Sequence, residues 1–124
     1  MQKENMIHQM KLDSGPFKMV KNGTKTVELH LFDEKRRMIK VGDVIVFTNT
    51  VNGEEVAVSV KALHRFSTFQ ELYASLPLTK CGYTEENLSY ADPSDMNGYY
   101  TDDEQKKYGV IGIEIGLYHK EEQR

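Results

Sequence analysis

Residues 43–66 carry the pattern that most restricts the fold, two β-forming runs separated by an Asn-Gly pair. The first run, DVIVFTN, is dense in Val, Ile and Phe, and the second, EEVAVSVKALHRF, alternates valine with smaller or polar residues. Asn52-Gly53 lies between them, and Asn-Gly is the strongest short-range signal of a β-hairpin because both residues accept positive φ angles. The chain is therefore predicted to build its core on an antiparallel sheet.

The rest of the chain contains further sequence signals of strands and helices. Three more runs have β-forming composition or alternation, residues 7–12, 24–31 and 110–121. Three short helices are predicted within residues 13–23, 68–77 and 101–109, each opening on a capping residue and ending at Gly or Pro. Residues 32–43 read as a polar connection with a turn. Strands linked by hairpins rather than long crossovers favour the α+β class, a small, mostly antiparallel β-barrel with three or so short helices.

Length and composition indicate one domain over residues 1–124 and exclude several protein classes. No apolar run approaches the roughly 18 residues of a membrane span, so no membrane partner is expected. The N-terminal residues lack the segments of a secretory signal, which favours a cytoplasmic location. Cys81 is the single cysteine, no Cys/His spacing indicates a zinc site, and no phosphate-binding or dinucleotide motif is present. We therefore expect no metal and no cofactor.

Charge is distributed unevenly along a chain whose formal net charge is −3. Residues 18–40 hold seven lysines and arginines against three acidic residues, whereas residues 85–104 hold seven acidic residues and no lysine or arginine. The first segment could attract an anion, and the second should repel one. The alternative is that both are solvated surfaces without a partner.

Lys25 and Glu28 are candidate functional residues at the predicted strand 24–31. A lysine in a partly apolar cleft can contact phosphate or act with a lowered pKa, whereas a surface Lys-Glu pair is worth only about 0–1 kcal/mol. Strict alternation places Lys25 with Val27 and Leu29 on one face and Glu28 with His30 on the other. A bulge or a strong bend would then be needed to bring Lys25 and Glu28 into one site.

The spacing Gly23-x-Lys25-x-x-Glu28-x-His30 resembles the Gly-x-Lys-x-x-Glu-x-Arg signature of the ASCH domain family, which belongs to the PUA-like superfamily of small β-barrels. The similarity extends over residues 7–49 and 64–77, and YYTDDEQKKYGVIGIEI resembles the closing segment of the bacterial single-domain branch. The resemblance implies a cleft beside the motif that receives single-stranded RNA or a modified nucleoside or nucleotide. His30 replaces the arginine of the signature, which exchanges a permanent charge for a titratable one.

The residues expected to bind such a ligand combine the motif with nearby basic and aromatic side chains: Lys21, Gly23, Lys25, Glu28, His30, Tyr99 and Tyr100. The two tyrosines could stack on unpaired bases, each worth roughly 1–3 kcal/mol, or could simply pack against the barrel.

Two other functions remain open from the sequence. The first is a small hydrolase with Lys25 and Glu28 as catalytic residues, acting on single-stranded RNA, with Tyr99 or Tyr100 assisting, or on an acylated nucleoside. An acetylcytidine amidohydrolase of the superfamily has a similar motif with threonine where this chain has Glu28. The second is a protein-interaction module that uses the acidic residues 85–104. Product formation would distinguish the hydrolase from a binding module.

Overall fold

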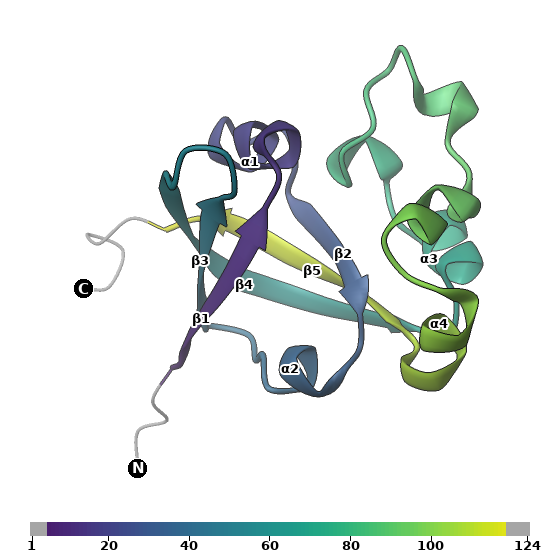
Figure 1. Cartoon of the computed structure of the whole chain (residues 1–124), viewed down its shortest axis with the longest axis horizontal. Coiled ribbons are helices and arrows are strands. Elements are labelled where there is room, and N and C mark those ends of the chain that lie inside the picture. Colours follow the sequence, from purple (N-terminus) through teal and green to yellow (C-terminus); the bar gives the residue numbers. More distant parts are fainter. Residues whose placement is uncertain (1–4, 119–124) are drawn as a thin grey trace.

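The computed structural model describes residues 5–118, whose backbone forms one curled five-stranded sheet and several short helices (Figure 1). The strands lie in the order β1-β3-β4-β5-β2. Their bounds are β1 Ile7–Leu12, β2 Val27–Leu31, β3 Val44–Asn49, β4 Glu55–Phe66 and β5 Val110–Leu117. The predicted α+β class with a small, mostly antiparallel β-barrel is confirmed, and the sheet takes the form of a curled half-barrel. The last part of the predicted final strand, residues 119–121, lies outside the described residues.

Strand connections differ from the prediction in two places. Strands β3 and β4 form the predicted Asn-Gly hairpin, with Thr48 opposite Glu55. However, β4 reaches β5 only after residues 67–109, and β1 pairs with β3 in parallel, which a hairpin cannot produce. A register shift between Val60 and Ala62 interrupts the β4–β5 ladder, as expected where a sheet bends.

The three predicted helices are present as α1 Ser14–Lys21, α3 Phe69–Ser75 and α4 Asp102–Tyr108. Capping explains the last two, because the Thr68 hydroxyl accepts the Glu71 N–H at 3.1 Å and Thr101 forms a reciprocal capping box with Glu104. A fourth helix, α2 Glu34–Arg37, was not predicted; it begins where the Asp33 carboxylate accepts the Arg36 N–H at 3.1 Å. Residues 78–98 add three 3₁₀ turns, η1 Leu78–Lys80, η2 Leu88–Tyr90 and η3 Pro93–Gly98.

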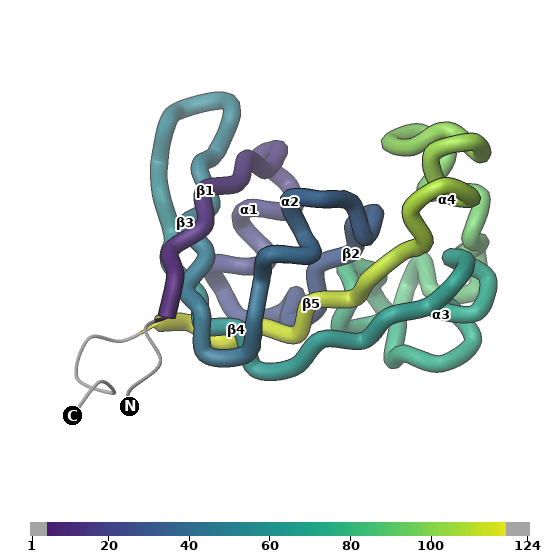
Figure 2. Tube along the Cα trace, turned by 90° about the horizontal axis from the view of Figure 1, so that it is seen from below, coloured from purple at the N-terminus to yellow at the C-terminus, as the bar shows by residue number. Residues whose placement is uncertain are grey.

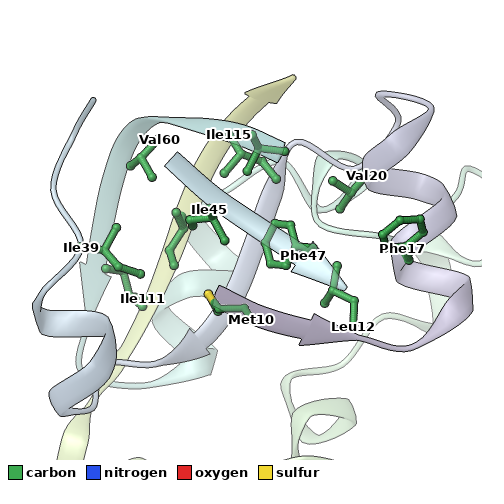
Figure 3. Close-up of a cluster of buried hydrophobic side chains, with 12 residues drawn as sticks. Met10, Leu12, Phe17, Val20, Ile39, Ile45, Phe47, Val60, Ile111 and Ile115 are labelled. Atoms are coloured by element: carbon green, nitrogen blue, oxygen red, sulfur yellow. The ribbon is translucent and has the colours of Figure 1, made fainter. Parts of the chain in front are cut away.

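Figures 1 and 2 show that the segment between β4 and β5, with α3 and α4, gathers at one end of the sheet, away from the β1–β3 pair. Two hydrophobic clusters follow from this arrangement. One packs α1 against the sheet through Phe17, Val20 and Phe47, beside Met10 and Leu12 (Figure 3). The other packs Val27, Leu29 and Leu31 of β2 against Phe69 and Leu72 of α3. Since alternate residues of a strand face opposite sides, Glu28 and His30 point away from the second cluster.

Candidate functional site

A cavity of about 720 Å³ lies between the two edge strands of the sheet. The end of β1 and the start of α1 form one wall, and β2 forms the floor with Glu28, Leu29 and His30. Residues 73–100 form the opposite wall. The volume is within the range of small-molecule sites and is sufficient for a nucleoside.

Lys25 and Glu28 meet in this cavity. The Lys25 ammonium lies 3.1 Å from Glu28 Oε1, and the two side chains are only 11% and 5% exposed. They converge because β2 begins at Val27, so the alternation of the strand does not extend to Lys25. The segment before β2 is held differently, with the Lys25 N–H donating to the Met19 carbonyl at 3.0 Å. No bulge in β2 is needed, contrary to the expectation from the sequence.

The Lys25 side chain lies close to Gly82 of the opposite wall. The φ of Gly82 is +114°, a conformation that favours glycine, and a Cβ atom there would lie 3.6 Å from Lys25 Cε. This distance is an ordinary van der Waals contact, so glycine is favoured at position 82 by its backbone conformation and not by the space that Lys25 fills.

Burial sets the protonation of the two acid-base groups on the floor. Desolvation raises the pKa of Glu28, and the Lys25 ammonium partly opposes this shift. Desolvation also lowers the pKa of His30 well below its ordinary value, and the charges of Arg36 and Lys25 add to the effect. His30 is therefore neutral at physiological pH.

Arg36 reaches the floor from α2 and was not anticipated from the sequence. Its Nη2 lies 3.3 Å from His30 Nδ1, and its Nη1 lies 3.2 Å from Asp33 Oδ2. The Tyr100 hydroxyl lies 3.0 Å from the same His30 nitrogen. The signal that could have indicated this contact is Asp33 as an N-cap, which starts a helix and directs Arg36 back toward β2.

Three buried polar atoms on this floor lack a hydrogen-bond partner within the described part of the chain: Glu28 Oε2, His30 Nε2 and Arg36 Nε. Buried polar atoms are nearly always hydrogen-bonded, so a cluster of three without partners requires an explanation. A bound polar molecule would satisfy them.

Tyrosines dominate the opposite wall. The Tyr73 and Tyr83 hydroxyls are 2.7 Å apart, and Tyr83 donates to Asp95 Oδ2 at 2.6 Å. Tyr99 is 66% exposed and stands at the rim, whereas Tyr100 is half-buried, and burial raises its pKa to about 12. The wall therefore presents aromatic surfaces and protonated hydroxyls.

The structure brings five of the seven predicted ligand-binding residues to the cavity: Lys25, Glu28, His30, Tyr99 and Tyr100. It leaves Lys21 and Gly23 outside the cavity walls, and Lys21 forms an exposed ion pair with Glu54. Sequence reasoning missed Arg36 and the residues of the opposite wall, because the order of loops in space has no short-range signal.

Charged residues of both signs line the cavity: Lys11, Lys25 and Arg36 against Asp13, Glu28 and Asp95. The cavity is thus less basic than residues 18–40 suggest. Within residues 5–118 no group of three or more metal-ligating side chains could hold a metal ion, and no helix is long and apolar enough to cross a membrane.

Cys81 also lines the cavity, but its side chain remains a protonated thiol. Desolvation raises its pKa to about 11, so only a minute fraction is thiolate near neutral pH. Cys81 is therefore a poor candidate for a nucleophile.

Comparison with known proteins gives a consistent result. The family model described as "ASCH domain" matches residues 10–119. The crystal structure of the hypothetical protein PH0355 is 31% identical, covers 91% of this chain and all of its own, and superposes with a TM-score of 0.76. The solution structure of PF0455 from Pyrococcus furiosus is 32% identical, covers 92% of this chain and 99% of its own, with a TM-score of 0.72.

A more distant structure shows the same fold. A mutant of ZmASCH from Zymomonas mobilis is 12% identical, covers 89% of this chain and 67% of its own, with a TM-score of 0.63. No curated protein sequence matches the chain significantly.

Proposed function

The chain belongs to the ASCH domain family, and from this premise we propose that it is a binding module, a single domain over residues 1–124, that takes single-stranded RNA or a modified nucleoside into its cavity. The observation that carries the proposal is the buried Lys25–Glu28 pair at the floor of a nucleoside-sized cavity. A buried pair is costly unless its remaining hydrogen-bonding capacity is used, and a ligand would use it.

Aromatic and charged residues around the cavity support a nucleic-acid component as the ligand. A base entering between β2 and the opposite wall could stack on Tyr99 or Tyr100, which contributes roughly 1–3 kcal/mol per base. The acidic residues 85–104 would repel a phosphate backbone on their side, so the backbone would leave the cavity toward Lys11 and Arg36.

The test is a titration of the protein with a short mixed-sequence single-stranded RNA, followed by backbone amide NMR at low and moderate salt. Shifts at residues 25–30, 81–83 and 99–100 that weaken with salt are expected. Lys25→Met should abolish them, whereas Lys21→Met, which changes an exposed lysine outside the cavity, should retain most of them. No shifts with RNA or with nucleosides would refute the proposal.

A hydrolase is the second candidate, and the raised pKa of Glu28 beside Lys25 favours it. The threonine of the similar amidohydrolase motif is absent, and Thr24 and Thr26 do not line the cavity. Water would therefore attack the acyl carbon of an acylated nucleoside such as acetylcytidine. Glu28 would take its proton, Lys25 would stabilise the oxyanion, and the C–N bond would break as the amine is protonated.

Lys25 and Glu28 could also act on a phosphodiester of single-stranded RNA. The length of the RNA recovered after the titration would reveal such cleavage. Shortened RNA would indicate a ribonuclease, and acetate released from acetylcytidine would indicate an amidohydrolase. Either product must disappear in both Lys25→Met and Glu28→Gln for the hydrolase to stand.

We also propose a partner, a location and a branch of the family from patterns in the sequence. A protein partner could bind the acidic residues 85–104, in which case cavity variants would leave its binding unchanged. A cytoplasmic location follows from the sequence patterns alone. Membership of a bacterial branch also rests on the sequence alone, since the similar structures include one from Pyrococcus furiosus.

A further inference from the structure

We propose that Arg36 is a positioning residue that fixes His30 as the tautomer protonated at Nε2, so that the cavity floor presents a hydrogen-bond donor beside the acceptor Glu28. The inference rests on the proposed function for its ligand, but not for its geometry. It also names the feature of the ligand that is recognised, a neutral edge with adjacent acceptor and donor atoms, such as the amide-like edge of a nucleobase.

The tautomer follows from the groups around His30 Nδ1. A guanidinium can only donate hydrogen bonds, and Arg36 Nη2 lies 3.3 Å from Nδ1. The Tyr100 hydroxyl at 3.0 Å is also protonated and can donate. A proton on Nδ1 could be donated only to the Tyr100 oxygen, and the Arg36 N–H group would then lose its acceptor and face a second donor. With the proton on Nε2, Nδ1 accepts from these donors, so we place the single proton of the neutral ring on Nε2.

The other side of the ring is left with an unused donor. Nε2 is 3.8 Å from Glu28 Oε1, too far for a hydrogen bond, and it has no other partner among the described residues. Glu28 Oε1 is already engaged by Lys25 at 3.1 Å, whereas Oε2 has no partner. One free donor and one free acceptor therefore lie next to each other on the floor.

A phosphate group would fit this pair poorly. It brings only acceptors, so it could satisfy His30 Nε2 but would place its charge against the carboxylate of Glu28. A neutral edge that donates to Oε2 and accepts from Nε2–H satisfies both atoms without adding charge to a lining that already holds both signs.

Helix α2 fixes the backbone of Arg36 and an ion pair with Asp33 fixes its guanidinium, which makes Arg36 suitable for orienting the His30 ring. Asp33 holds Nη1 at 3.2 Å, and its carboxylate also caps α2. Neighbouring Arg37 differs, because its guanidinium lies 4.3 Å from the Phe32 ring and it does not line the cavity. Arg37→Met is therefore a matched control for Arg36→Met on the same helix.

The experiment reads the tautomer directly, by long-range ¹H–¹⁵N NMR of the histidine rings in the free protein, with His30→Gln used to assign the His30 signals. We expect a protonated-type signal for Nε2 and an unprotonated-type signal for Nδ1. In Arg36→Met the two signals should move toward each other as the tautomers mix, while Arg37→Met and Tyr100→Phe should keep them separate. Arg36→Gln, whose amide can accept as well as donate a hydrogen bond and therefore does not force Nδ1 to accept, provides a second variant if Arg36→Met does not fold.

A second experiment, a set of ligand titrations, distinguishes a failure of this inference from a failure of the proposed function. Cytidine, uridine, inorganic phosphate and two RNA hexamers, one normal and one with a single abasic nucleotide, would be titrated into the wild type and Arg36→Met. We expect the nucleosides and the normal hexamer to shift the floor residues, phosphate to have no effect, and Arg36→Met to lower nucleoside affinity about tenfold.

Three outcomes would overturn the inference. One is a proton on Nδ1 of the free wild-type protein, and another is an unchanged tautomer in both Arg36 variants. The third is equal binding of the normal and abasic hexamers, which would leave RNA binding intact but show that no base edge is read. Absence of binding by every probe would instead refute the proposed function and leave the tautomer result standing.

Discussion

Lowering the pH from 7 to 5 is expected to destabilise the protein through protonation of His30. The pKa of this ring is well below 6.5 in the folded protein, chiefly because the ring is buried and secondly because Arg36 and Lys25 are close. The unfolded chain therefore takes up a proton near pH 6.5 that the folded protein does not. This stabilising contribution is present above pH 6.5 and is lost as the pH falls toward the folded pKa.

The size of the effect follows from the linkage between proton binding and folding. For one group it is about 1.4 kcal/mol of unfolding free energy per pH unit, or up to about 2 kcal/mol between pH 6.5 and 5. That is a large share of the 5–15 kcal/mol typical of a small domain. Glu28 acts in the opposite direction, because its pKa is raised, so its contribution grows as the pH falls through the folded pKa toward 4.5. The His30 slope is therefore cleanest just below pH 6.5.

Urea denaturation at half-unit steps from pH 7.5 to 5 measures this slope in the wild type and two variants. His30→Gln, which keeps a polar group of similar reach, should remove most of the slope. His64→Gln changes a partly exposed histidine paired with Glu114 at 3.1 Å and should leave the slope in place. If the wild type and His30→Gln lose stability in parallel, the buried ring is not the source, and the argument for a neutral His30 fails with it.

Three further predictions address the cavity. Lys25→Met should cost about 3 kcal/mol of unfolding free energy at pH 8, because it leaves a buried carboxylate unpaired. The cost should be smaller at pH 5, because the raised pKa of Glu28 favours the uncharged carboxyl as the pH falls, and equal losses at the two pH values would contradict this. Gly82→Ala should lower stability by about 1–3 kcal/mol through its φ of +114°, and an unchanged midpoint in thermal denaturation would show that the backbone adapts. Cys81, with a pKa of about 11, should react with iodoacetamide at pH 8 roughly a hundredfold more slowly in the folded than in the urea-unfolded protein, and equal rates would place the thiol in solvent.

Local signals in the sequence were sufficient for most of the elements. The Asn-Gly turn identified the β3–β4 hairpin, and the capping residues Thr68 and Thr101 identified α3 and α4. These signals work because each depends on a few neighbouring residues whose hydrogen bonds do not involve the rest of the chain. The parallel β1–β3 pair had no such signal, since it joins strands that are separated by α1, β2 and α2.

The site was only half predictable for a related reason. Lys25, Glu28 and His30 were identified by the spacing of their residue types, but their convergence depends on β2 starting at Val27, and strand ends are difficult to place from sequence. Arg36 was not identified as a site residue, because residues 32–43 have the composition of a polar connection and helix α2 was not predicted there. Tyr83 and Asp95 reach the cavity through a long irregular segment whose path is set by packing against α3 rather than by local preference.

The polar side chains on the cavity floor are accommodated because the sheet is open between its two edge strands. Strands β1 and β2 are the two edges of the sheet, and the cavity lies between them, so side chains on β2 face a space rather than another strand. Helix α2 bridges the opening, because Lys35 donates to the Gln9 carbonyl of β1 at 2.7 Å while Arg36 contacts His30 of β2. If the edges paired instead, no ligand could reach the buried atoms of Glu28 and His30 that have no partner within the described residues, and their energetic cost would persist. The same bridge that keeps the half-barrel open therefore also positions the groups that a ligand would meet.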